Sequence, residues 1–192
     1  TIMLAIQNKS WNVYDVLSAH RAIDVNITNA HDETPLMYLA LLGETKRAED
    51  LIKRGAKVNR LGWTPLHYAA STGQVETARM LLAAGALPNS PSSDGTSPLM
   101  MAARSGNRDV VNVLIEAGAD PKAVNLQQLN AADWARESGH TSLASYLEQG
   151  GNAAASSSGS NASVAPVAPS ASQNNGGGSS NSQYFDLGRF DD

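Results

Sequence analysis

Histidines and a pair of carboxylates are the side chains of this chain best suited to metal binding or acid–base chemistry. The carboxylate pair is Asp32–Glu33, and the four histidines are His20, His31, His67 and His140. The sequence holds no H-E-x-x-H pair and no cysteine, so it indicates neither a zinc site nor a thiol nucleophile. It also lacks the phosphate-binding motif G-x-x-x-x-G-K-[ST] and the nucleophile elbow G-x-S-x-G. We therefore predict a protein that is not an enzyme and that uses no cofactor and no metal.

Four related segments recur along the chain and predict the elements that position its side chains. They read T-P-L-M-Y-L-A-L-L-G-E from Thr34, T-P-L-H-Y-A-A-S-T-G-Q from Thr64, S-P-L-M-M-A-A-R-S-G-N from Ser97 and N-A-A-D-W-A-R-E-S-G-H from Asn130. Thr or Ser caps a helix, Pro fits its first turn because no N–H is needed there, and Gly ends it. The first three segments therefore each predict a short helix, and the fourth keeps the spacing without the proline.

A second apolar block follows each of the first three segments, at helical spacing, and stops at a glycine. The blocks read A-E-D-L-I-K-R-G-A, T-A-R-M-L-L-A-A-G-A and D-V-V-N-V-L-I-E-A-G-A, and they contain Gly55, Gly85 and Gly118. One such helix pair cannot bury its own apolar face, so neighbouring pairs must stack to form a core. The pattern predicts an all-α stack of helix pairs.

The segment T-P-L-H-Y-A-A at residues 64–70 resembles the signature of the ankyrin repeat, and the steps of 30, 33 and 33 residues resemble its length. The resemblance implies an all-α ankyrin-repeat solenoid of about five repeats over residues 1–150. We expect a partial repeat at 1–33, repeats at 34–63, 64–96 and 97–129, and a C-terminal cap at 130–150, whose outer face exchanges apolar for charged residues. Because the first repeat is partial, we expect further residues upstream of Thr1.

Charge and hydropathy exclude two classes of partner. The net charge is −4 and the basic residues are spread out, whereas a general nucleic-acid surface needs clustered Lys and Arg. No run of 18 apolar residues occurs, so no membrane span is predicted. The whole arrangement also resembles exported ankyrin-repeat proteins of proteobacteria. That resemblance implies a periplasmic or secreted setting, with the cytoplasm as the alternative.

The family resemblance implies that a partner meets the concave face, at the turn before each first helix and at the positions just before its glycine. The partner-binding residues expected from it are Leu41, Leu42, Arg60, Leu61, Trp63, Ser71, Thr72 and Arg104. Leu41, Leu42 and Trp63 are apolar where other repeats are polar, which predicts an exposed apolar patch typical of a partner site. Two alternatives stay open. In the first, Trp63 folds over its own short turn and Leu41 and Leu42 fill the gap, so that no exposed patch forms. The second concerns Tyr38 and Tyr68, which either extend the patch or pack in the core.

Three other conspicuous residues have structural interpretations. His67, in T-P-L-H, is expected to bond the backbone of the neighbouring turn. Met100 and Met101 are expected in the core.

The C-terminal segment, residues 151–192, is predicted to be a disordered tail. Most of it is Ser, Gly, Asn and Ala, which cannot bury enough apolar area to offset the loss of chain entropy. It ends in a motif of large apolar side chains among aspartates, namely Tyr184, Phe185, Leu187 and Phe190. Three possibilities stay open for this motif. It docks on a partner, it docks on its own groove or on a neighbouring chain, or it has no role.

We predict a non-enzymatic interaction module that binds a protein partner through the concave ankyrin groove. The alternative is an exported factor that protects or inhibits an enzyme or toxin by blocking its surface, with the tail motif docking in cis or in trans. A stack that binds a metal or a small ligand is a third class, which thermal shift with such ligands would detect.

Overall fold

The computed structural model describes residues 2–151, and in this range the chain is helical and contains no strand. Its ten helices there are α1 (Ile2–Gln7), α2 (Trp11–Ala19), α3 (Pro35–Leu42), α4 (Thr45–Lys53), α5 (Pro65–Ser71), α6 (Val75–Ala83), α7 (Pro98–Ser105), α8 (Arg108–Glu116), α9 (Ala131–Glu137) and α10 (Thr141–Glu148). The predicted all-α fold class is confirmed. The predicted tail motif, Tyr184, Phe185, Leu187 and Phe190, lies outside the described residues.

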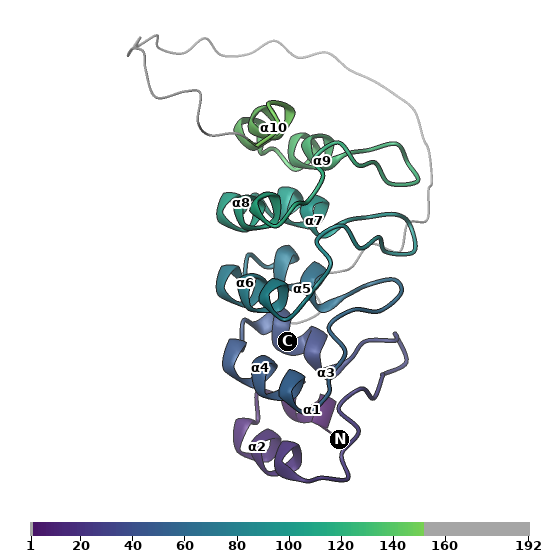
Figure 1. Ribbon diagram of the computed structural model, residues 1–192, viewed down its shortest axis with the longest axis vertical. Coiled ribbons are helices and arrows are strands. Elements are labelled where there is room, and N and C mark those ends of the chain that lie inside the picture. Colours follow the sequence, from purple (N-terminus) through teal and green to yellow (C-terminus); the bar gives the residue numbers. More distant parts are fainter. Residues whose placement is uncertain (1, 152–192) are drawn as a thin grey trace, which may run out of the picture. The chain divides into compact units, whose positions relative to one another are not determined.

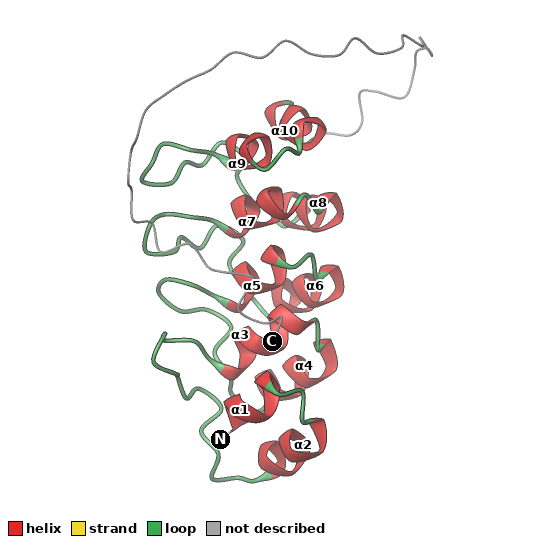
Figure 2. Ribbon diagram, turned by 180° about the vertical axis from the view of Figure 1, so that it is seen from behind, coloured by secondary structure: helices red, strands yellow, loops and turns green. Residues whose placement is uncertain are grey.

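The helices form two layers of stacked pairs (Figures 1 and 2). The inner helices α1, α3, α5, α7 and α9 make one layer, and the outer helices α2, α4, α6, α8 and α10 make the other. Each inner helix packs on the next inner helix along the stack. The loops that lead into α3, α5, α7 and α9 all project on the side of the inner helices. We call residues 29–33, 60–63, 92–96 and 125–129 the finger loops.

Local signals begin and end the inner helices as the sequence predicts. The backbone N–H of Met37 donates to the hydroxyl of Thr34 at 3.4 Å, and that of Met100 donates to the hydroxyl of Ser97 at 3.3 Å. Each hydroxyl thereby satisfies one of the N–H groups that a helix start leaves without an intrahelical partner. Gly43 follows α3 with φ 72°, a conformation that costs little only for glycine. The inner helices are therefore short because both of their ends are specified.

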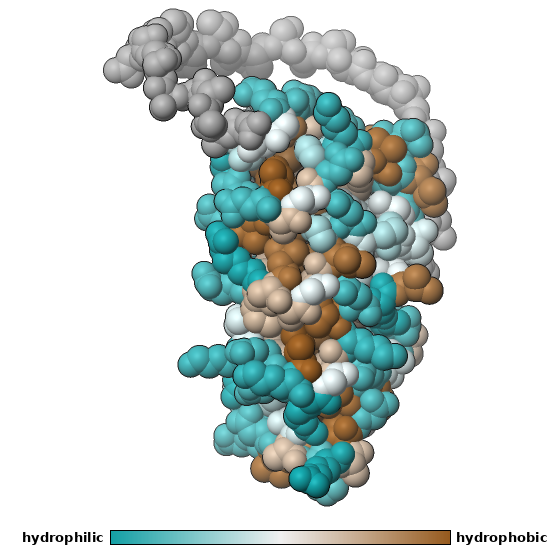
Figure 3. Space-filling model, viewed as in Figure 1, coloured by the Kyte–Doolittle hydropathy of each residue, from teal (hydrophilic) through white to brown (hydrophobic). Residues whose placement is uncertain are grey.

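Small side chains let the inner helices approach one another closely. The inner helices carry fully buried alanines, namely Ala40, Ala69, Ala102 and Ala135. Three successive outer helices each bury a leucine at the same position of the helix, namely Leu51, Leu81 and Leu114. Met100 and Met101 are buried, which confirms their prediction as core residues. Figure 3 shows apolar residues as a stripe along the middle of the stack, flanked by hydrophilic side chains.

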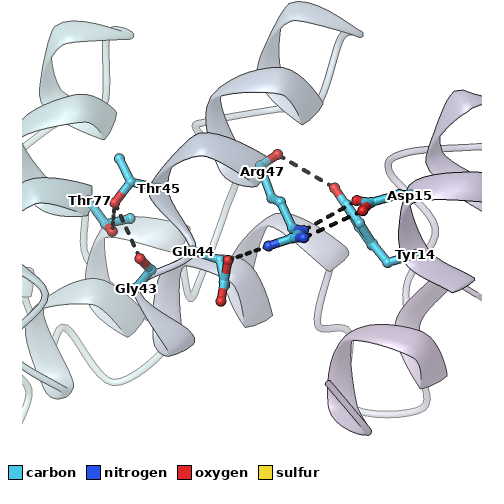
Figure 4. Close-up of polar contacts among 7 residues, drawn as sticks. All are labelled: Tyr14, Asp15, Gly43, Glu44, Thr45, Arg47 and Thr77. Carbon is cyan, nitrogen blue, oxygen red and sulfur yellow. Dashed lines mark hydrogen bonds and ion pairs between the residues drawn. The ribbon is translucent and has the colours of Figure 1, made fainter. Parts of the chain in front are cut away.

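Polar contacts link successive outer helices (Figure 4). The guanidinium of Arg47 on α4 donates to the carboxylate of Asp15 on α2 at 3.3 Å and to Glu44 at 2.8 Å. The hydroxyls of Thr45 on α4 and Thr77 on α6 lie 2.7 Å apart and share a hydrogen bond. These contacts tie α2 to α4 and α4 to α6.

The two ends of the stack differ in polarity. At the α1–α2 end, Leu4, Val13 and Val16 are exposed beside a cleft of about 150 Å³. The outer side of α10 carries exposed polar residues instead, namely Thr141, Ser142, Ser145 and Glu148. A polar outer side is what a terminal repeat needs where it meets water.

Candidate functional site

The first finger loop closes on itself through Asn29. The side-chain oxygen of Asn29 accepts from the backbone N–H of His31 at 2.9 Å and from that of Glu33 at 3.0 Å. The backbone N–H of Asn29 donates to the carbonyl of Glu33 at 3.1 Å. This Asx-type turn uses asparagine to replace backbone partners, so the loop has a defined shape of its own.

Glu33 fixes this finger to two inner helices. Its carboxylate, only 7% exposed, accepts from Asn29 Nδ2 at 2.7 Å, from the Tyr38 hydroxyl at 2.7 Å and from the Tyr68 hydroxyl at 2.9 Å. Gln7 Nε2 on α1 donates to the Tyr38 hydroxyl at 3.0 Å. We call Gln7, Asn29, Glu33, Tyr38 and Tyr68 the Glu33 cluster. It joins α1, α3 and α5 to the first finger.

The cluster keeps its carboxylate ionised. Burial alone raises the pKa of Glu33, but the hydrogen bonds from Asn29, Tyr38 and Tyr68 outweigh it and lower that pKa below its usual value. Burial and then the negative charge of Glu33 raise the pKa of the Tyr68 hydroxyl. The hydroxyls therefore remain donors and the carboxylate remains the acceptor. This site is a structural anchor and not an acid–base pair.

Sequence reasoning missed this anchor. It considered Asp32–Glu33 only as a carboxylate pair and left Tyr38 and Tyr68 open between surface patch and core. Both tyrosines are buried, so the core alternative holds for them. A signal was present, because a glutamate precedes the cap of α3 and a tyrosine follows at the same place in two successive repeats.

The second finger is held by the first finger and by α5, the helix that follows it. The guanidinium of Arg60 donates to the carbonyl and the carboxylate of Asp32 in the first finger. Trp63 is half-buried, and its ring meets that of His67 edge-on, with centroids 5.2 Å apart. Leu61, between them, is 96% exposed. The finger thus presents one large apolar side chain on a loop that is itself fixed.

His67 is structural, as the sequence predicts. Its Nδ1 accepts from the backbone N–H of Thr64 at 3.1 Å, and its Nε2 lies 3.0 Å from the carbonyl of Thr96 in the next finger. Full burial lowers the pKa of His67 to about 4, although its contact with the Thr96 carbonyl opposes the shift. The ring is therefore neutral near pH 7 and donates through Nε2.

Two of the predicted partner-binding residues are not on the surface. Leu41 is 5% exposed, because the next helix pair closes over it: Thr72 Oγ1 and Gln74 Nε2 both donate to its carbonyl, at 2.9 and 3.3 Å. Ser71 is also buried, and its hydroxyl donates to the carbonyl of Tyr68 at 2.8 Å. The expected patch of Leu41, Leu42 and Trp63 is therefore not a broad exposed surface.

The other predicted residues keep accessible area. Thr72 and Leu61 are exposed, whereas the remaining four are half-buried, namely Leu42, Arg60, Trp63 and Arg104. These six side chains belong to α3, α7, the second finger and the residue that follows α5. We call them the finger face.

The third and fourth fingers are bonded to each other. The backbone N–H of Leu126 donates to the carbonyl of Asp94 at 2.9 Å. The carboxylate of Asp94 accepts from the Ser92 hydroxyl and from the N–H and hydroxyl of Thr96. These bonds outweigh burial and lower the pKa of Asp94. Leu126, like Leu61, projects from its fixed finger and is largely exposed.

Metal binding and membrane insertion find no support in residues 2–151. That range contains no group of three or more His, Asp or Glu placed to hold a metal ion. None of its helices combines the length and the apolar character that crossing a bilayer requires.

Stacked helix pairs with finger loops on one side define the class of the molecule as a helical repeat solenoid. A family model of ankyrin repeats in three copies matches residues 2–92, and a model of the single ankyrin repeat matches residues 94–126. The chain belongs to the ankyrin-repeat family, which confirms the resemblance. A search among curated proteins returned no match to it. Ankyrin-repeat proteins are typically non-enzymatic, and their repeats mark the chain as a protein–protein interaction module.

Proposed function

We propose that the finger face binds a protein partner, with Leu61 as its apolar anchor. The observation that carries the proposal is the exposure of Leu61, at 96%, on a finger tied to its neighbours. Leu61 stands between the half-buried Arg60 and Trp63, and arginine and tryptophan are enriched among the residues that carry most of the binding free energy at interfaces. Truncating such an anchor removes a large share of the binding free energy.

The surroundings of Leu61 support this role. Arg60 is held by Asp32, and Trp63 is held against His67, so the loop needs little ordering when a partner arrives. Pre-organisation of this kind lowers the entropic cost of association. Leu42, Thr72 and Arg104 extend the accessible surface along the inner helices. Leu41 and Ser71 are buried beneath the finger face, so they support it by packing and do not contact the partner.

The experiment is affinity capture with three full-length baits: the natural sequence, Leu61→Asp and Leu87→Asp. Leu87 is the matched control, because it is an exposed leucine in the loop after α6. We expect a protein retained by the natural chain and by Leu87→Asp, with recovery on Leu61→Asp reduced at least about tenfold. Equal retention by all three baits, with circular dichroism showing all three folded, would rule out Leu61 as the anchor.

The finer form of the proposal concerns the kind of partner. In it the chain is an exported factor, periplasmic or secreted, that protects or inhibits an enzyme or toxin by covering its surface. The motif Tyr184, Phe185, Leu187 and Phe190 then adds a second contact, in cis or in trans. Assay of the captured protein with and without the chain tests the blocking role. The same capture with the four motif residues changed to Ala tests the tail.

A further inference from the structure

The last finger repeats the geometry of the first one. The side-chain oxygen of Asn125 accepts from the backbone N–H groups of Gln127 and Leu129, both at 3.0 Å, as Asn29 does in the first finger. The backbone N–H of Asn125 donates to the carbonyl of Leu129, again at 3.0 Å. Gln128 has φ 62° and Asp32 has φ 61°, so even the left-handed residue occupies the same place. The two loops are therefore equivalent position by position.

The residues around these loops are equivalent too. Counted from the helix caps Thr34 and Asn130, Asn125 takes the place of Asn29, and Trp134 takes the place of Tyr38. Arg104 lies two residues before Gly106, which follows α7. Gln7 lies two residues before Lys9, which takes the place of that glycine after α1. The guanidinium carbon of Arg104 lies 5.8 Å from the centroid of the Trp134 ring, whereas Gln7 donates a hydrogen bond to the Tyr38 hydroxyl. We call Arg104, Asn125, Leu129 and Trp134 the Trp134 cluster.

One of the substitutions between the two clusters removes the hydrogen-bond acceptor. Leu129 stands where the first cluster has Glu33, so the acceptor is gone while the donors remain. Asn125 Nδ2 and Trp134 Nε1 are buried and have no hydrogen-bond partner among residues 2–151. Their residues are 3% and 6% exposed. Buried donors without an acceptor are rare in folded proteins and call for an explanation.

The second cluster is more positively charged than the first. The first cluster holds a carboxylate, and its neighbour from the preceding repeat is the neutral Gln7. The second has lost the carboxylate and has gained the guanidinium of Arg104, which binds carboxylates through paired N–H groups. Two donors and a cation therefore surround the position at which the first finger carries its own carboxylate.

We infer that the Trp134 cluster binds a carboxylate, supplied by an aspartate or glutamate side chain of the protein partner. Trp134 Nε1 and Asn125 Nδ2 donate to its oxygens, and Arg104 neutralises its charge. Leu129 is only half-buried. The inference requires its side chain to turn aside when the carboxylate enters. The source of the carboxylate rests on the proposed function, whereas its binding chemistry does not.

The test follows the indole N–H signals of the full-length chain by ¹H–¹⁵N NMR during titration with sodium acetate. Sodium chloride at equal ionic strength is the control, and Trp134→Phe assigns the signal. We expect the Trp134 indole proton to move downfield and to saturate with acetate only. The signals of Trp11 and Trp63 serve as internal references. A Trp134 signal that behaves alike in acetate and chloride, both in this chain and after Asp186, Asp191 and Asp192 are changed to Asn, overturns the inference.

One variant supplies a carboxylate from within the chain, a second is its control, and a third weakens the site. Leu129→Glu places the carboxylate within the chain, so its Trp134 signal starts downfield and ignores acetate. Leu126→Glu adds the same charge at the exposed tip of the same finger and should leave the response intact. If Leu129→Glu does not fold, Arg104→Gln tests the inference instead. Because this variant removes the cation, it should weaken acetate binding about tenfold. Unchanged binding by Arg104→Gln overturns the inference.

The chain contains a competing source of carboxylates in Asp186, Asp191 and Asp192. If acetate has no effect until these three are changed to Asn, the tail is the occupant and the assignment to a partner is overturned. Failure of the proposed function is distinguishable, because capture through Leu61 and the acetate response of Trp134 are measured independently.

Discussion

The first and the last finger loops share one backbone design but differ in how they are completed. In the first, Glu33 accepts from Asn29, Tyr38 and Tyr68, and every donor of the cluster is used inside the chain. In the last, Leu129 removes the acceptor and leaves the donors of Asn125 and Trp134 unmatched within residues 2–151. The comparison teaches that the residue before the helix cap, Glu33 or Leu129, decides whether the donors of an equivalent loop are satisfied inside the chain, and on our inference the unsatisfied donors form a binding site.

The largest effect is expected when the first cluster is given the composition of the last. Glu33→Leu leaves the Asn29 amide and the hydroxyls of Tyr38 and Tyr68 without their shared acceptor. Because unsatisfied buried donors cost about 1–3 kcal/mol, we expect the free energy of unfolding to fall by about 3 kcal/mol. Urea denaturation followed by circular dichroism measures it. Glu76→Leu, at an exposed position on α6, is the control and should change stability by less than about 0.5 kcal/mol. A similar loss in both variants would contradict the anchor role.

Much of this architecture follows from the sequence alone. The caps Thr34 and Ser97, the prolines behind them and the terminal glycines predict the helix pairs, because these signals act within a few residues. The role of His67 was expected from the T-P-L-H motif, although its contact with Thr96 joins two repeats. The contacts of Glu33 with Tyr68 and of Arg104 with Trp134 join different repeats, and their strength depends on burial that no single repeat reveals. For the same reason Leu41 and Ser71 were expected on the surface, although the next helix pair covers them.

An intermediate effect is expected from changing the equivalent asparagines to aspartate. Asn29→Asp removes the donor to Glu33 and places a second carboxylate beside it, which should cost about 2 kcal/mol. Asn125→Asp keeps the acceptor for both backbone N–H groups and removes a donor that has no partner in residues 2–151, so the cost should stay below about 1 kcal/mol. Thermal and urea unfolding of the two variants measure the difference. Equal costs would mean that Asn125 Nδ2 is satisfied in solution, and the contrast between the clusters would disappear.

The smallest effect concerns the pH dependence of the first cluster. The folded pKa of Glu33 lies below its ordinary value of 4.5, so its ionised form stabilises the fold above that pH. This contribution is lost as the pH falls through the folded pKa. Glu33→Gln keeps the shape of the side chain and cannot titrate, and we expect it to cost about 1 kcal/mol at pH 7. The gap between the two chains should narrow as the pH falls below 4.5, because Glu33 becomes protonated first in the unfolded chain and, at lower pH, in the folded chain as well. His67 loses its contribution between pH 6.5 and about 4 in both chains alike, and therefore cancels from the difference. Unfolding free energies of the two chains at pH 7 and pH 3 provide the measurement, and a gap that stays constant would show that the charge of Glu33 does not stabilise the finger.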